Sequence, residues 1–162
     1  MSDKKGTNDP LLQWVSFRLD QETYAIDVML VQEVRRHSEI APVPGADSDV
    51  MGIINLRGSV VTVIDTRVRL SHQCGELTDD TRIIIVEHQD EVIGLYVDEV
   101  SEVIYLRQSE IERSPKVGSD DARRYISGVC NKGDRLYILL AVDKLLGGAD
   151  LAAGADQELE LF

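Results

Sequence analysis

Histidine and cysteine, the side chains most often used as metal ligands and nucleophiles, are few in this sequence and widely spaced. The three histidines are His37, His72 and His88, and the two cysteines are Cys74 and Cys130. His72 and Cys74 are close in sequence, but a structural zinc site needs four ligands and no second pair follows at a suitable spacing. We therefore predict no metal site, and we expect both cysteines to be free thiols in a reducing compartment.

The short motifs of common enzymes are also missing from the sequence. It contains no glycine-rich phosphate-binding loop, no G-x-G-x-x-G and no G-x-S-x-G. Acidic residues are numerous but scattered, which is typical of a solvated face and not of a catalytic carboxylate pair. We predict a protein that is not an enzyme and holds no cofactor. An enzyme whose catalytic groups converge from distant positions remains an alternative.

The charge balance also restricts the possible partners. The formal net charge is −12, from 29 acidic and 17 basic side chains, so nucleic acid and anionic lipid are repelled over long range. The arginine pairs at 35–36 and 123–124 each have acidic neighbours. No run approaches the roughly 20 apolar residues of a membrane span, and the first ten residues contain no apolar signal segment. We expect a cytoplasmic protein with no nucleic-acid partner and no membrane insertion.

The elements that would position a binding site are predicted to be mostly β-strands. Apolar and polar residues alternate with a period of two in residues 15–19 and 24–28, which is typical of half-buried strands. Further strands are expected at 53–56, 59–64, 83–86, 92–97, 125–130 and 135–142, and short helices at 65–70, 109–113 and 143–146. Several turn signals separate these runs, including Arg57-Gly58 and the segment 131–134.

The two halves of the chain resemble each other. Residues 22–34 and 91–103 share five of 13 positions at an offset of 69, where composition alone gives roughly one. Gly-Ile-Ile-Asn at 52–55 is echoed by Gly-Val-Cys-Asn at 128–131, and each echo continues through a turn and an apolar strand to an aspartate, Asp65 or Asp143, before a short helix. An internal duplication follows, and it predicts a mainly-β fold of two tandem five-stranded β-barrel subdomains.

The predicted organisation has three parts. Residues 1–10 form a flexible N-terminus, residues 11–147 form the folded domain with halves near 12–70 and 81–146, and residues 148–162 form a flexible acidic tail. The groove between the two barrels is a plausible site for a helix of a partner.

Several segments follow one another in a characteristic order. They are Val-Gln-Glu-Val-Arg at 31–35, Gly-Ile-Ile-Asn-Leu-Arg-Gly at 52–58, Val-Ile-Asp-Thr-Arg at 63–67, Val-Ile-Gly-Leu-Tyr-Val-Asp-Glu-Val at 92–100, and the hairpin from Gly128 to Asp143. In this order they resemble the CheW domain family, from about Trp14 to Leu146. One departure is Thr62, which lies in a strand where the family often has a proline.

The resemblance implies a fold of two SH3-like barrels and a role as a chemotaxis adaptor. Such a stand-alone coupler binds the regulatory domain of the histidine kinase CheA and the cytoplasmic tip of chemoreceptors, and it is recruited from the cytoplasm to membrane-associated receptor arrays. The alternative is a small β-barrel module that binds peptide or RNA and has no link to chemotaxis. Low aromatic content and negative charge argue against RNA.

By resemblance, Val31, Glu33 and Arg57 are the candidate receptor-binding residues. Arg57 can hold a carboxylate with two hydrogen bonds, either Glu33 within the protein or a group of the partner. Val28, Met29 and Val31 are expected either to be core residues or to form an apolar groove.

Two further groups complete the candidate residues. Gly52, Asn55 and Gly58 are expected to shape the backbone that presents Arg57. The candidate kinase-binding residues in the second half are Ile93, Gly94 and Tyr96, for which strand packing is the alternative interpretation.

Overall fold

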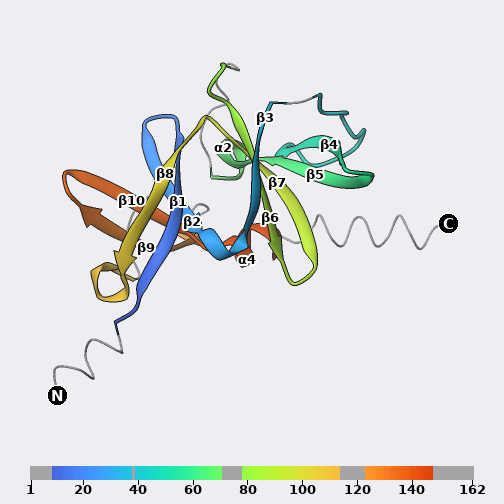
Figure 1. Cartoon of the computed structure of the whole chain (residues 1–162). Helices are drawn as coiled ribbons and strands as arrows, with labels where there is room; N and C mark the ends of the chain where they lie inside the picture. The colour runs from blue at the N-terminus through green and yellow to red at the C-terminus, as the bar shows by residue number, and fades with distance from the viewer. Residues whose placement is uncertain (1–8, 38, 71–77, 114–122, 148–162) are drawn as a thin grey trace.

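The computed structural model describes residues 9–37, 39–70, 78–113 and 123–147, and it consists mainly of β-strands. The strands are β1 (Leu11–Leu19), β2 (Glu22–Asp27), β3 (Val31–Arg36), β4 (Val50–Leu56), β5 (Ser59–Asp65), β6 (Arg82–His88), β7 (Glu91–Val97), β8 (Glu99–Arg107), β9 (Ile126–Lys132) and β10 (Arg135–Leu140). Short helical turns connect them: η1 (Val28–Leu30), α2 (Thr66–Arg69), η2 (Gln108–Glu110) and α4 (Val142–Gly147). The predicted mainly-β fold with short helices is confirmed (Figure 1).

The strands form two five-stranded sheets with the same internal order. Sheet A runs β8-β1-β2-β10-β9 and sheet B runs β3-β6-β7-β5-β4. Strands β1 to β5 of the first half correspond, in chain order, to strands β6 to β10 of the second half. Replacing each strand by its counterpart converts the strand order of sheet A into that of sheet B. Each sheet contains one parallel pair, β2 with β10 in sheet A and β5 with β7 in sheet B, and its other strand pairs are antiparallel. This equivalence supports the predicted repeat.

The third strand of each half is exchanged between the sheets. β3 follows β2 along the chain but pairs with β6, and β8 follows β7 but pairs with β1. Figure 1 shows β8 lying beside β1, away from β6 and β7. The sequence repeat gives no indication of this exchange, because similarity between halves does not say which strands hydrogen-bond to each other. Neither half therefore completes its own barrel.

Each sheet is closed into a barrel by one short bridge at a glycine. Ala41 exchanges backbone hydrogen bonds of 2.9 and 2.8 Å with Ile53, and Glu112 makes the matching pair with Val129 at 2.8 and 2.9 Å. A Cβ atom on Gly52 would lie 2.2 Å from the Ala41 carbonyl oxygen. The close approach of the crossing chain requires glycine there.

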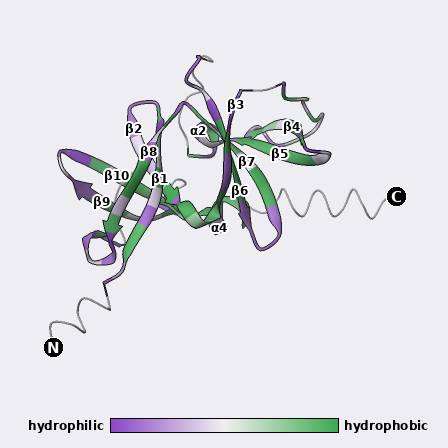
Figure 2. Ribbon diagram, viewed as in Figure 1, coloured by the Kyte–Doolittle hydropathy of each residue, from purple (hydrophilic) through white to green (hydrophobic). Residues whose placement is uncertain are grey.

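Three apolar clusters hold the fold together. The largest lies between the two sheets and draws on both, with Phe17 and Ile26 from sheet A and Ile64 and Leu95 from sheet B among its fully buried members. A second cluster is formed by residues of sheet B alone, and a third by residues of sheet A alone. In Figure 2 the strands carry the hydrophobic residues and the hairpin tips are hydrophilic. Because burial of apolar surface is the main stabilising term in folding, the inter-sheet cluster joins the barrels into one folded unit.

The structure corrects three details of the sequence prediction. Asp65 caps α2 by accepting from the Arg67 backbone N–H at 3.0 Å, but Asp143 lies inside α4 and not ahead of it. Asp9 and Pro10, expected in the flexible N-terminus, are held by η2: the Ser109 backbone N–H donates to Asp9 at 2.7 Å, and that of Gln108 donates to the Pro10 carbonyl at 3.1 Å. Val28 belongs to η1 and not to the preceding strand. Residues 1–8 and 148–162, with His72 and Cys74, lie outside the described residues.

Candidate functional site

The tip of the β4–β5 hairpin places an arginine in an unusual backbone conformation. Arg57 has φ of 50° and Gly58 has φ of 88°, and the Gly58 N–H donates to the Asn55 side-chain oxygen at 2.9 Å. Asparagine, aspartate and glycine are the residues that favour the first central position of such a turn. An arginine there costs on the order of 1 kcal/mol, which suggests that its side chain is needed.

The guanidinium group of Arg57 holds the carboxylate of Glu33 on β3. Arg57 Nη2 donates to Glu33 Oε1 at 2.8 Å, and Nη1 donates to Oε2 at 3.4 Å. The Glu33 side chain is 27% exposed and that of Arg57 is 68% exposed. The hydrogen bond from Arg57, assisted by the charges of Arg57 and Arg35, lowers the pKa of Glu33 below its ordinary value. The pair stays ionised at neutral pH and ties the hairpin tip to β3.

A second arginine lies on the other side of the same carboxylate. Arg35 Nη1 is 3.9 Å from Glu33 Oε2, and the buried Nε atom of Arg35 has no hydrogen-bond partner within the described residues. Glu33 and Arg35 pair in register with Ile85 and Ile83, which belong to the cluster that fills sheet B. This face of β3 carries Glu33 and Arg35, and the neighbouring hairpin tip adds Arg57 as a second basic group.

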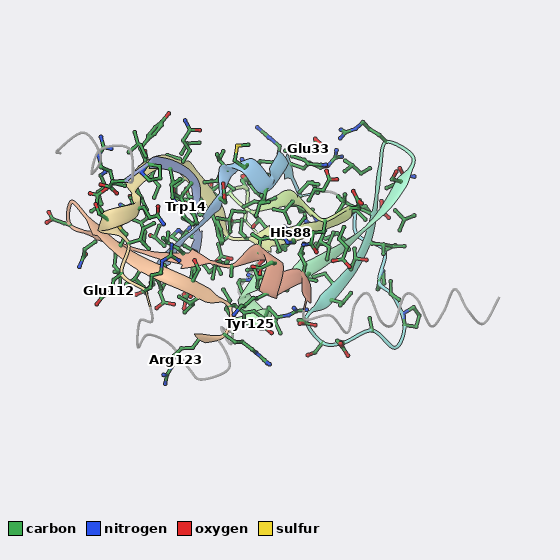
Figure 3. All side chains as sticks on the ribbon, turned by 90° about the horizontal axis from the view of Figure 1, so that it is seen from below. Trp14, Glu33, His88, Glu112, Arg123 and Tyr125 are labelled. Carbon is green, nitrogen blue, oxygen red and sulfur yellow. The ribbon has the colours of Figure 1, made fainter. Side chains whose placement is uncertain are left out.

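The opposite face of β3 carries Val34 and the exposed Arg36, and Val34 lies toward the cluster between the sheets. Val34 pairs with Ile84 of that cluster and is 42% exposed, while Val31 is half-buried against the same cluster. The predicted receptor-binding residues thus divide between two faces: Val31 lies on the inter-sheet side, and Glu33 points toward Arg57. β3 is an edge strand of sheet B, so both faces meet at one rim of the molecule. In Figure 3, Glu33 lies on the opposite side of the molecule from Arg123 and Tyr125.

One exposed apolar position was missed by the sequence analysis, and another had been left open by it. Val103 on β8 is 46% exposed and is the counterpart of Val34 in the repeat, and Met29 on η1 is 84% exposed. Val103 pairs with Val15, a member of the inter-sheet cluster, just as Val34 pairs with Ile84. Val34 and Val103 are identical at the repeat offset, and this identity could have identified them as equivalent positions. Their exposure could not be predicted, because it depends on the strand exchange. Met29 resolves one open alternative, because it is exposed whereas Val28 packs against the cluster.

The three candidate kinase-binding residues are buried, so their assignment as contact residues is corrected. Ile93, Gly94 and Tyr96 lie on β7, which is flanked by β6 and β5. A Cβ atom on Gly94 would lie 2.9 Å from the Ile83 side chain, so the missing side chain permits close packing within sheet B. Tyr96 is fully buried and Ile93 is only 6% exposed, so neither offers a contact surface in this conformation. The strand-packing interpretation therefore holds for all three.

A buried ion-pair network joins the two sheets, and the sequence analysis did not foresee it. Arg67 on α2 donates to Asp65 at 3.0 Å through two nitrogens and to Asp98 at 3.1 Å, and its side chain is almost fully buried. Asp98 also accepts from the Asp20 backbone N–H in the β1–β2 turn at 2.6 Å. On the same helix, Arg69 pairs with Asp49 and donates to the Leu145 carbonyl oxygen at 2.7 Å. Arg69 therefore connects α2 to α4, and Arg67 connects it through Asp98 to the β1–β2 turn of sheet A.

Catalytic or metal-binding arrangements do not emerge from the described residues. No group of three His, Cys, Asp or Glu side chains within them is arranged to hold a metal ion. Burial raises the pKa of the Cys130 thiol, which keeps it protonated and unreactive. The hollow beside α4 is open, and its lining includes His88, Glu91 and Asp143 but no serine, cysteine or lysine. Among the described residues, no helix is both long enough and apolar enough to cross a bilayer.

Comparison with known proteins gives a consistent result. The family model of the CheW-like domain matches residues 13–150. The chain is 31% identical over 140 residues to the chemotaxis protein CheW of Klebsiella aerogenes, covering 86% of this chain and 84% of that protein. It is 36% identical over 132 residues to CheW of Bacillus subtilis, covering 82% and 85% of the two chains.

A solved structure shows the same fold. The crystal structure of the scaffolding protein TtCheW from Thermoanaerobacter tengcongensis superposes with a TM-score of 0.76 at 33% sequence identity, covering 82% of this chain and 90% of that one. The two five-stranded sheets are thus found in a chain of related sequence. This protein belongs to the CheW-like domain family, a family of chemotaxis scaffold and adaptor proteins.

Proposed function

We propose that this protein couples chemoreceptors to the histidine kinase CheA by binding both, without catalysing a reaction itself. The observation that carries the proposal is the rim at β3, where Arg57 is held by Glu33 at a strained hairpin tip beside exposed apolar side chains. Binding surfaces of adaptors combine apolar contact area with fixed polar groups in this way. The membership of the CheW-like family supplies the chemotaxis context.

The proposed receptor-binding rim comprises Val31 and Val34 on its inter-sheet side and the exposed Met29 as apolar contacts, with Glu33 and Arg57 as the polar part on the other side. A helical hairpin tip fits such a surface, because an amphipathic helix presents an apolar stripe bordered by polar residues. The exposed apolar atoms supply contact area. The ion pair supplies orientation and selectivity, since charged groups at a rim act more on specificity than on affinity.

The kinase must use exposed side chains instead of the buried ones on β7. Val60 on β5 is 70% exposed, and its counterpart Leu136 on β10 is 41% exposed. The two residues pair with Asn55 and Asn131, which occupy equivalent hairpin positions. We place the kinase contact on one of these two hairpins, and the substitutions Val60→Ser and Leu136→Ser distinguish them by their effect on binding of the kinase regulatory domain.

A three-component assay tests the proposal. The purified protein is mixed with a receptor tip fragment and the kinase from the same cell, and kinase autophosphorylation and co-sedimentation are measured. We expect receptor-dependent activation by the parent and its loss in Arg57→Ala, with Arg18→Ala, which breaks the exposed ion pair with Glu99 in sheet A, as the matched control. Failure of the folded parent to bind either partner would overturn the adaptor function.

A further inference from the structure

A hollow at the end of the β3–β6 strand pair gathers basic and hydroxyl side chains. It is open to solvent and has a volume of about 610 Å³, which lies in the range of small-molecule sites. The residues that line it are Arg36, His37, Thr78, Asp79, Thr81 and Arg82. The proposed coupling function uses none of these residues, so the hollow needs an explanation of its own.

Two arginines oppose each other in this hollow. Arg36 on β3 and Arg82 on β6 are direct partners in the antiparallel pair, which places their Cβ atoms about 5 Å apart on one face of sheet B. Like charges at directly opposite positions destabilise a strand pair. Within the described residues, Arg36 makes no hydrogen bond or ion pair, and Arg82 donates only to the backbone carbonyls of Asp79 and Thr81, at 2.7 and 2.9 Å. The two positive charges therefore repel each other without a carboxylate bound to either.

A second pair of opposed cations in the same protein is neutralised from within. Lys132 and Arg135 are direct partners at the β9–β10 hairpin. Lys132 lies 3.6 Å from Glu110 and donates to the Tyr105 carbonyl at 2.8 Å. The chain has 29 acidic side chains against 17 basic ones, yet no described carboxylate plays this part for the arginines of the hollow. An external anion can supply the missing negative charge there.

The histidine of the hollow is held in place by a buried tyrosine. His37 Nδ1 lies 3.2 Å from the Tyr96 hydroxyl, and the two rings meet edge to face with their centroids 5.9 Å apart. Tyr96 is fully buried in sheet B, so it gives the imidazole a rigid support. When the hydroxyl donates to Nδ1, the neutral ring carries its proton on Nε2 and can donate a hydrogen bond from that atom.

The two threonines can also donate to a ligand. Thr81 Oγ1 accepts from the Thr78 backbone N–H at 3.1 Å, and Thr78 Oγ1 accepts from the Asp80 backbone N–H at 3.1 Å. These bonds fix the position of each hydroxyl and leave its hydrogen for another acceptor. Arg82 is likewise ordered in advance by its two carbonyl partners, which removes part of the entropic cost of binding. Asp79 is the one acidic residue among the six that line the hollow, and its carboxylate repels an anion.

We propose that this hollow binds a phosphoryl group, with Arg36 and Arg82 as the main ligands and His37 and the threonine hydroxyls as additional donors. A phosphate monoester carries a charge of about −1.5 to −2 at neutral pH and offers three acceptor oxygens. Planar guanidinium groups bind such oxygens with parallel hydrogen bonds. A single carboxylate, with one charge and two oxygens, neutralises only one of the two arginines. The proposal goes beyond the coupling function and does not depend on it.

Titration of the full chain, followed by NMR amide shifts, tests the site directly. Inorganic phosphate, a short phosphoserine peptide and AMP are added at constant ionic strength, with malonate as a dianion that lacks a phosphoryl group. We expect saturable shifts at Arg36, His37 and Arg82 with phosphate, and binding of malonate at least about three-fold weaker. Shifts that never saturate, or tighter binding of malonate, would overturn the proposal.

The two phosphate carriers identify the source of the phosphoryl group. Tighter binding of the phosphoserine peptide than of AMP supports the site and indicates a phosphorylated protein. Tighter binding of AMP supports the site and indicates a small metabolite. If neither carrier nor inorganic phosphate shifts the amides of the hollow in the folded parent, the proposal fails.

Substitutions separate a site from general attraction between charges. Arg36→Gln removes one exposed charge from the hollow, and Arg135→Gln removes the same charge from the other opposed pair. We expect Arg36→Gln to weaken phosphate binding at least about ten-fold and Arg135→Gln to stay within about two-fold of the parent. Equal weakening by the two variants, each shown by its spectrum to be folded, would contradict a site in the hollow.

Removal of the acidic residue gives a change of opposite sign. Asp79→Asn takes away the carboxylate that faces the ligand and is expected to tighten phosphate binding by about three-fold. The same NMR titration measures the change. Weaker phosphate binding in Asp79→Asn would overturn the proposal, because it would make the carboxylate a favourable contact, which an oxyanion ligand does not allow.

Discussion

The β4–β5 and β9–β10 hairpins occupy equivalent places in the two barrels but are held by different chemistry. At the first, the guanidinium group of Arg57 donates to the side chain of Glu33 on the exchanged strand β3. At the second, Lys132 Nζ donates to the backbone carbonyl of Tyr105 on the exchanged strand β8 at 2.8 Å and lies 3.6 Å from Glu110. Both tips thus reach back to the exchanged strand. Only at the first hairpin is the acceptor a side chain of the exchanged strand. The donor and the acceptor can therefore be substituted independently there.

The helices that follow the two hairpins differ more sharply. In α2 the two arginines are buried, and each is held by an aspartate while it also donates toward the other sheet. In α4 the buried positions are the apolar residues Val142, Leu145 and Leu146, and Asp143, the counterpart of Arg67, is exposed. The glycine closures at Gly52 and Gly128 are retained in both halves. The duplication has therefore kept the backbone geometry, while charged side chains are concentrated in the half that carries the proposed receptor face.

The largest predicted effect concerns the buried charges of α2. Arg67→Ala is expected to lower the free energy of unfolding by about 3–5 kcal/mol, because it leaves the charges of Asp65 and Asp98 without their shared partner. The matched change in α4, Asp143→Ala, removes an exposed charge and is expected to stay within about 0.5 kcal/mol of the parent. Denaturant unfolding of the three proteins measures both values.

A second variant guards against failure of Arg67→Ala to fold. Asp98→Asn keeps the size of the side chain and an acceptor oxygen but loses the charge that Arg67 faces. It is expected to cost about 1–3 kcal/mol, the usual penalty for weakening a charged buried hydrogen bond. Equal stability of Asp98→Asn and the parent would show that the inter-sheet network adds nothing beyond apolar packing, and the contrast between α2 and α4 would lose its energetic meaning.

The next prediction compares how closely the crossing chain approaches the glycine at the two barrel closures, Gly52 and Gly128. Gly52→Ala is expected to destabilise the fold by about 2–3 kcal/mol, because the new Cβ meets a backbone oxygen at 2.2 Å and the residue has φ of 149°. Gly128→Ala is expected to cost about 1–2 kcal/mol, because its Cβ meets Ile111 Cγ2 at 2.8 Å and the Glu112 carbonyl oxygen at 2.9 Å, both less close than the oxygen at Gly52. Thermal unfolding midpoints give the ranking, and a larger loss at Gly128 would contradict the difference in closeness between the two bridges.

The sequence predicted the parts of this fold that depend on local pattern. Period-two alternation located most strands, and the repeat paired Gly52 with Gly128 before their shared closure was known. Burial could not be predicted in the same way, since Ile93 and Leu95 on one face of β7 and Gly94 and Tyr96 on the other are all buried. The network of Arg67 and Asp98 joins residues 31 positions apart across two sheets. Such contacts follow from the strand exchange, which no local pattern encodes.

The smallest effect is a difference in titration at the two hairpin ends. The pKa of Glu33 is lowered chiefly by the side chain of Arg57, whereas that of Glu110 is lowered chiefly by the Arg107 backbone N–H, with Lys132 contributing less. Arg57→Ala should therefore return the pKa of Glu33 toward its ordinary value of 4.5, while Lys132→Ala should leave the pKa of Glu110 low. Carboxyl carbon shifts followed by NMR over the acidic range measure both groups.

The sign of the linked stability follows from the direction of the shift. A carboxyl group whose pKa is lower in the folded protein stabilises the fold above its unfolded pKa, and this contribution is lost as the pH falls through the folded pKa. The parent should therefore exceed Glu33→Gln in unfolding midpoint at neutral pH, and the gap should close below the folded pKa of Glu33. The gap between the parent and Lys132→Ala should change less over the same range, because the Arg107 amide continues to bind the Glu110 carboxylate. An equal response of the two ends would mean that the hairpins are held by the same electrostatics, and the contrast between side-chain and backbone pairing would have no consequence in solution.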